Sequence, residues 1–371
     1  MIYFDNAATT EVDKEVIKTM IDVLENTYGN PSGKYYDQAL KANKIIEEAR
    51  EKTAKFLNSE EDEIIFNSGA SEGNNHILKG VALENKGCHI ITSNLEHNST
   101  LKACMDLEEV GYEITYLKGN SLGVISLEDL KKSIKSNTKL VSIIWANNEI
   151  GSVNNIKGIL QICNEKNILL HVDATQMVGK RKIDLSDFKI DFLTFSGHKI
   201  YGPKGVGVLY IKRDRYGLFP DLKPLISGSQ EDDQRGGTYC THNIAGLGKA
   251  IEVLENIQNK YIENLNNLEG YLLEKLEGLP LTLNGYNKDS KVPGILNIQI
   301  PGVNNEIFIK ENSEMLALST GSACSLSKPS HVLENIGIDK FKIRNSIRIS
   351  LGKKNTIKEI DEFINILKKY I

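Results

Sequence analysis

Short apolar runs separated by helical patterns constrain the fold of this chain more than any other feature of its sequence. Most of these runs lack polar alternation, as expected of parallel strands buried on both faces of a sheet. Seven runs are predicted strands, at residues 63–66, 89–92, 113–117, 140–145, 169–172, 192–195 and 206–211. Helical patterns lie between several of them, at residues 71–84, 99–110, 127–134 and 156–166. The alternation predicts a doubly wound α/β domain.

The character of the sequence changes after the last of these strands. A glycine- and charge-rich loop at 227–237 precedes a long helical pattern, in which apolar residues from Ile244 to Leu276 keep three- and four-residue spacing. Two shorter strands (294–300 and 346–350) and a closing helix near 356–370 then predict a smaller α+β domain. We expect a large domain over residues 13–255 and a small domain formed by residues 1–12 and 256–371.

Charge and composition narrow the classes of partner. The formal net charge of −4 arises from 45 basic and 49 acidic residues without basic blocks, which argues against direct nucleic-acid or anionic-membrane binding and favours a small-molecule substrate. No apolar run approaches the roughly 18 residues of a membrane span, and the N-terminus does not read as a signal peptide. The five cysteines show no CxxC spacing, so we expect free thiols, no metal site and a cytoplasmic protein.

Three polar motifs directly follow predicted strands. The first, Ser68-Gly69-Ala70-Ser71-Glu72-Gly73-Asn74-Asn75, offers backbone N–H groups and a hydroxyl at a helix start, where a phosphate could bind. An ordinary glycine turn with a serine cap explains this motif about as well.

Asp173 and Lys199 occupy the other two strand ends. Asp173, in the run 171–176, could pair with a protonated pyridine nitrogen, although a helix cap would be the commoner reason for a single aspartate. Lys199 ends the sequence Ser196-Gly197-His198-Lys199 and could form a Schiff base with an aldehyde cofactor, whereas most isolated lysines are surface charges. Since ligands bind at the carboxyl ends of α/β strands, the three motifs support one another.

A fourth motif lies in the smaller domain. Cys324 is flanked by glycine, serine and alanine in Ser319-Thr320-Gly321-Ser322-Ala323-Cys324-Ser325, a composition typical of an exposed loop in which a thiolate can react. A buried, inert cysteine is the alternative interpretation.

Taken together, these motifs resemble the cysteine desulfurases of the NifS/IscS-like branch of fold type I, aminotransferase class V enzymes, which depend on pyridoxal 5′-phosphate (PLP). The resemblance extends almost from end to end and also rests on residues 3–10, 29–32, 95–97, 147–151, 202–207, 235–238 and 346–348. It implies a large domain with a mostly parallel seven-stranded sheet, a smaller α+β domain and a homodimer.

The resemblance also implies roles for individual residues. Lys199 looks like the Schiff-base lysine. Cys324 looks like the thiol that takes sulfur from L-cysteine, which forms a persulfide and leaves L-alanine. His97 looks like the residue stacked on the ring and is a candidate proton carrier. Arg348, with Asn148, would bind the substrate, since a guanidinium suits a carboxylate. The residues that would bind the cofactor are Ala70, Ser71, His97, Asn148, Asp173, Gln176, Ser196, His198, Lys199 and, from the second subunit, Thr238.

Some features depart from the usual pattern of this branch. The stretch after Cys324 looks short, and the loop at 227–237 is unusually acidic. These departures leave open which protein accepts the sulfur, and whether the sulfur is used for iron–sulfur cluster assembly or for another thiolation. Cys240 beside His242 could be a second thiol or a metal ligand, although a structural role is favoured because no further ligands are evident. Selenocysteine lysis, another PLP-dependent transfer or a non-catalytic scaffold are the competing functions.

Overall fold

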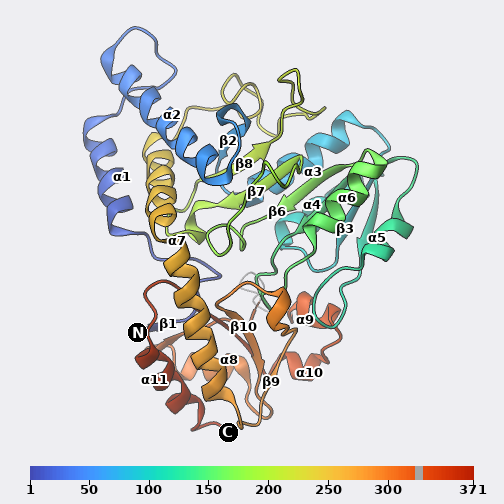
Figure 1. The fold of residues 1–371 in the computed structure, drawn as a ribbon, viewed down its shortest axis with the longest axis vertical. Helices are drawn as coiled ribbons and strands as arrows, with labels where there is room; N and C mark the ends of the chain where they lie inside the picture. The colour runs from blue at the N-terminus through green and yellow to red at the C-terminus, as the bar shows by residue number, and fades with distance from the viewer. Residues whose placement is uncertain (322–328) are drawn as a thin grey trace.

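The computed structural model describes residues 1–321 and 329–371 and contains a seven-stranded sheet at its centre (Figure 1). The strand order is β2-β8-β7-β6-β5-β3-β4, and β8 runs antiparallel to both of its neighbours while the other adjacent pairs are parallel. The strands are β2 (Ile64–Asn67), β3 (His89–Ser93), β4 (Glu113–Leu117), β5 (Thr138–Ile144), β6 (Leu169–Asp173), β7 (Phe192–Ser196) and β8 (Gly207–Ile211). The predicted fold class, with a mostly parallel seven-stranded sheet, is confirmed.

Helices α3 (Ala70–Glu84), α4 (Asn98–Glu109), α5 (Leu127–Ser133) and α6 (Ile156–Lys166) connect strands of this sheet, as the periodicity predicted. Side-chain caps define where several of them begin: Ser126 accepts a hydrogen bond from the backbone of Asp129, and Asn155 accepts one from Gly158. These local signals lie in the sequence itself, so the elements were predictable to within a few residues.

Two helices near the N-terminus were not predicted. These are α1 (Lys14–Asn26) and α2 (Asp37–Leu57), which both pack against the 36-residue helix α7 (Thr241–Leu276). Their stripes of buried residues are made largely of valine and small alanines, such as Val16 and Val23 in α1 and Ala42 and Ala49 in α2. Small residues on these stripes allow close helix packing: the Ala49 Cβ lies only 2.7 Å from an ideal Cβ at Gly248 in α7. The apolar period of both helices is at least as clear as that of α3 and α4, so the signal was present in the sequence and the prediction omitted it.

A second group of strands lies around the lower half of α7 in Figure 1. A three-stranded antiparallel sheet has the order β12-β10-β9, from Ser346–Ser350, Ile295–Gln299 and Thr282–Leu283, and β1 (Ile2–Tyr3) pairs in parallel with β11 (Leu316–Ala317). The remaining helices there are α8 (Asn305–Glu311), α9 (His331–Asn335), α10 (Lys340–Ile343) and α11 (Ile357–Leu367). The first residues of the chain therefore join its C-terminal part, while the exact boundaries 13–255 and 256–371 stay a prediction.

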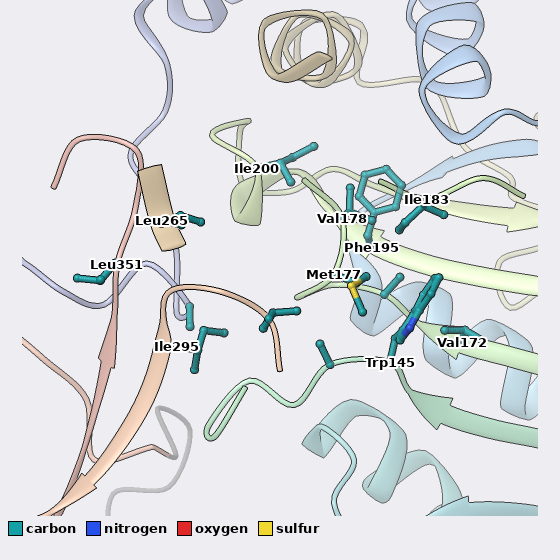
Figure 2. Packing of buried hydrophobic residues seen from close by; sticks show 14 of the residues in the cluster. Trp145, Val172, Met177, Val178, Ile183, Phe195, Ile200, Leu265, Ile295 and Leu351 are labelled. Atoms are coloured by element: carbon teal, nitrogen blue, oxygen red, sulfur yellow. The ribbon is translucent and has the colours of Figure 1, made fainter. Parts of the chain in front are cut away.

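One hydrophobic cluster extends through both groups of strands. Figure 2 shows Val172 and Phe195 from the large sheet, Leu265 from α7, Ile295 from the small sheet and Leu351 directly after its strand β12. This shared core fixes the two groups of strands relative to each other, because close-packed interiors deform little. Over the described residues, no helix is both long and apolar enough to cross a bilayer.

Candidate active site

A cavity of about 220 Å³ lies where the carboxyl ends of the central strands meet the small sheet. The strands bring Asp173, at the end of β6, and Ser196, at the end of β7, to the same edge. Nearly every residue predicted to bind cofactor or substrate lines this cavity: Ala70, Ser71, His97, Asn148, Asp173, Gln176, Ser196, His198, Lys199 and Arg348. The edge is the one at which parallel α/β sheets bind their ligands.

Asp173 presents a buried carboxylate to the cavity, with 3% of its surface exposed. The Asn74 Nδ2 group donates to its Oδ2 atom at 2.8 Å, and the Thr175 backbone N–H donates to its Oδ1 atom at 3.0 Å. Asn74 is itself held by Thr194, whose hydroxyl donates to the Asn74 Oδ1 atom at 2.6 Å. These hydrogen bonds fix the direction of the Asp173 carboxylate, as a partner for a protonated ring nitrogen requires.

Lys199 follows β7 in a single 3-10 turn (Gly197–Lys199) and extends to the N-terminal segment. Its Nζ atom donates to the carbonyl oxygens of Ala7 and Ala8 at 2.6 and 2.7 Å. The amine thus lies in the cavity close to a segment almost 200 residues away in sequence.

One end of the cavity is suited to an anion. Ala70 and Ser71 form the first turn of α3, and the Ser196 hydroxyl accepts a hydrogen bond from the Ala70 N–H at 2.8 Å. The His198 Nδ1 atom lies 3.1 Å from the Thr9 hydroxyl, and burial, followed by nearby lysines, lowers the pKa of His198 to about 4. Helix N–H groups, hydroxyls and a neutral imidazole together form a site in which a phosphate can accept several hydrogen bonds.

His97 caps α4 and also lines the cavity. Its Nδ1 atom accepts a hydrogen bond from the Ser99 backbone N–H at 3.2 Å and lies 2.9 Å from the Ser99 hydroxyl. Burial lowers the pKa of His97, and the charge of Lys199 lowers it further against the opposing effect of Asp173. A neutral imidazole held at Nδ1 can stack on an aromatic ring and accept a proton.

Arg348 lies in β12 with only 1% of its surface exposed. It donates to the Asp5 Oδ1 atom at 2.6 Å and to the Asn148 carbonyl oxygen at 3.0 Å. Its Nε atom is buried and forms no hydrogen bond with any described residue. A buried guanidinium with an unsatisfied N–H suits a carboxylate ligand, because an unpaired buried donor is costly.

Glu149 is a functional-site residue that the sequence did not single out. Its buried carboxylate accepts a hydrogen bond from the Ser330 hydroxyl, and burial raises its pKa. An added Cβ at Gly321 would lie 2.6 Å from the Glu149 Oε2 atom. Gly321, Glu149 and His331 all line the cavity, and the His331 Nε2 atom lies 2.9 Å from the Glu96 carbonyl oxygen. Glu149 therefore contacts the chain on both sides of residues 322–328.

Three sequence predictions concern residues elsewhere. Cys324, the predicted sulfur-accepting thiol, lies outside the described residues. Thr238 does not line the main cavity but a separate hollow between the end of α1 and the start of α7. Cys240 lies in the same hollow, with its Sγ atom 3.5 Å from the His242 Nε2 atom. Among the described residues, no group of three or more His, Cys, Asp or Glu side chains is arranged to hold a metal ion.

Comparison with known proteins shows the family of this chain. Residues 2–363 match the family model of aminotransferase class-V proteins. The chain belongs to this family. It is 42% identical over 380 residues to a cysteine desulfurase IscS of Clostridium botulinum, in an alignment that covers 100% of this chain and 94% of the relative. It is 40% identical over 378 residues to the cysteine desulfurase IscS of Dictyoglomus turgidum, with the same coverage.

Solved structures of the family share the fold. A NifS-like protein superposes with a TM-score of 0.91 at 35% identity, over 99% of this chain and 98% of that one. A structure of SspA in complex with cysteine gives a TM-score of 0.81 at 36% identity, over 96% and 100% of the two chains. The predicted membership of the NifS/IscS-like branch is thereby confirmed.

PLP is the cofactor of this family, and the cavity has the chemical groups to hold it. A buried carboxylate suits the ring nitrogen, an amine suits the aldehyde, and the first turn of α3 suits the phosphate. Apart from Glu149, sequence reasoning missed Asn74 and Asp5, which orient Asp173 and Arg348. Both lie inside motifs that had been noted, but only the tertiary structure shows which residue each one contacts.

Proposed function

We propose that the chain is a cysteine desulfurase, which converts L-cysteine to L-alanine and retains the sulfur as a persulfide on Cys324. The observation that carries the proposal is the convergence of Lys199, Asp173 and Arg348 on one cavity in a chain 42% identical to a cysteine desulfurase. Bound PLP supplies an aldehyde for amines and an electron sink for charge that develops at the substrate Cα atom.

Residues of the chain itself bind the cofactor and the substrate and transfer protons. With PLP bound, the Lys199 amine would hold the aldehyde carbon and would also be a base for the substrate Cα proton; the Asp173 carboxylate would pair with the ring nitrogen. The Arg348 guanidinium would hold the substrate carboxylate, and neutral His97 would stack on the ring and carry protons. Asn148 and Gln176 would contact the phenolic side of the ring, while Ala70, Ser71, Ser196 and His198 would hold the phosphate.

Sulfur transfer requires Cys324 as a thiolate, because a neutral thiol is a poor nucleophile. Its sulfur attacks the substrate sulfur, so an S–S bond forms while the substrate Cβ–S bond breaks. The carbon keeps the electron pair of the broken bond and, after protonation, leaves as alanine. The persulfide sulfur then passes to an acceptor protein for iron–sulfur cluster assembly or another thiolation.

A homodimer with shared sites is part of the proposal. Thr238 does not line the cavity of its own chain, so we propose that it reaches the phosphate bound in the cavity of a second subunit. Helix α1 supports such an arrangement because Ile17, Ile21 and Leu24 form an exposed apolar stripe with helical spacing, and Tyr28 continues it. We further propose that residues 13–255 form the cofactor domain and residues 1–12 and 256–371 the domain that carries Cys324.

The test is incubation of the purified protein with L-cysteine and a reductant, followed by measurement of alanine and sulfide. Equal yields of both are expected. Cys324→Ser should keep PLP bound and perturb its spectrum with L-cysteine, yet carry no persulfide by mass spectrometry. Cys240→Ser is the matched control and should leave sulfur transfer intact. A persulfide on Cys240 together with full activity of Cys324→Ser would contradict the assignment.

A further inference from the structure

Lys180 is a buried lysine beside the active site to which no role has yet been given. It follows β6 and has 6% of its surface exposed. Its Nζ atom donates to the Gln176 Oε1 atom at 2.7 Å, and Gln176 lines the cavity. Burial and, to a smaller extent, the charges of Lys199, Arg348 and Lys291 together lower the pKa of Lys180 to about 7.

The cations around Lys180 have other partners. Lys291 pairs with Glu269, Arg348 pairs with Asp5, and Lys199 donates to backbone carbonyls. Within residues 1–321 and 329–371, no carboxylate lies at ion-pair distance from Lys180 itself. A buried lysine without a carboxylate is costly, and methionine would fill the same space without that cost. Packing alone therefore does not explain the amine at this position, whereas its hydrogen bond to Gln176 suggests a function for it.

Two contacts determine how the Gln176 amide is oriented. The Lys180 Nζ atom donates to the amide oxygen, so the amide turns its oxygen toward Lys180. A carbonyl oxygen can only accept, so the amide must turn its nitrogen toward Ala7, whose oxygen it meets at 2.9 Å. The same Ala7 oxygen accepts from Lys199 at 2.6 Å. The nitrogen side of the amide is thus held next to the amine that binds the cofactor.

We propose that Lys180 is a positioning residue that locks the Gln176 amide so that its nitrogen donates a hydrogen bond to the phenolic oxygen of PLP. The inference rests on the proposed function, since it requires PLP bound through Lys199. A donor stabilises the anionic phenolic oxygen and lowers the proton affinity of the adjacent Schiff base. Without Lys180 the amide can rotate and place its oxygen against the cofactor.

The experiment is a spectrophotometric pH titration of the resting holoenzyme, which reports the Schiff-base pKa without turnover. Lys180→Met should raise this pKa by about one unit or more, the size expected for a lost hydrogen bond to a charged group. In a Gln176→Ala background the same substitution should give no further shift, because the group that it orients is gone. Lys180→Arg, which can only donate, should restore the wild-type value.

Two further variants complete the design. Lys166→Met removes an exposed lysine at the end of α6 and should leave the titration unchanged. Lys180→Gln serves if the methionine variant does not fold; because its amide both donates and accepts, it should raise the pKa in the same direction. An unshifted pKa in the folded variants, or an equal shift in the Gln176→Ala background, overturns the positioning role. A wild-type protein with no PLP band from Lys199 instead overturns the proposed function.

Discussion

Replacement of Arg348 by lysine tests how the substrate is held. The guanidinium uses one nitrogen for Asp5 and another for the Asn148 carbonyl oxygen, and leaves Nε unsatisfied among the described residues. A lysine keeps the positive charge opposite Asp5 but has a single side-chain nitrogen. It therefore cannot contact Asp5 and the Asn148 carbonyl oxygen and also bind a carboxylate through two parallel N–H groups, as arginine can. The substitution therefore removes substrate contacts without leaving Asp5 unpaired.

The expected magnitude follows from the loss of one charge-assisted hydrogen bond. Such a bond contributes about 1.5–3 kcal/mol. At about 1.4 kcal/mol per tenfold change, the dissociation constant for L-cysteine should rise about 10- to 100-fold. Cysteamine lacks the carboxylate, so its dissociation constant should stay within about twofold of the wild-type value on the same reasoning.

The assay is a titration of the cofactor spectrum with each ligand in a Cys324→Ser background, which prevents turnover. Arg344→Lys is the matched control, because Arg344 lies four residues earlier and is exposed. Equal weakening for L-cysteine and cysteamine would refute the reasoning, since it would mean that Arg348 acts on the fold of the site and not on the carboxylate. Unchanged binding of L-cysteine would refute it as well.

Three further outcomes are expected. Lys199→Ala should abolish turnover and the protein–PLP linkage that borohydride reduces; a variant that keeps both would contradict the assignment of Lys199. Lys199→Ala and Thr238→Ala protomers should regain activity when mixed into heterodimers, because one site then has both residues intact, and no gain over the parents would argue against shared sites. Burial lowers the pKa of His76 and of His171 to about 4, so both are neutral in the fold and take up protons on unfolding below about pH 6.5. The free energy of unfolding should therefore fall as the pH drops from about 6.5 to 4, by up to about 3 kcal/mol per histidine, and His171→Asn should flatten this dependence in denaturant titrations.

The central sheet and the helices that connect its strands could be predicted because their signals are local. A parallel strand buried on both faces must be apolar throughout, and a capped helix carries its period and its cap within a few residues. Asp173 and Lys199 follow predicted strands directly, so their place at the ligand-binding edge also followed from the sequence. Helices α1 and α2 were missed although their apolar period is at least as clear as that of α3 and α4, so this omission was not forced by the sequence.

The residue types at the strand ends, the family resemblance and the order of the elements can be read from the sequence. The folded chain is needed to show which distant groups meet: Arg348 with Asp5, 343 residues apart, and Lys199 with Ala7, 192 residues apart. The tertiary structure also shows that Thr238 does not line the cavity of its own chain and that Lys180 donates a hydrogen bond to the Gln176 amide oxygen. The physical reason is that hydrophobic periodicity acts over a few residues, whereas hydrogen bonds and ion pairs in a packed core depend on where the whole chain brings each group.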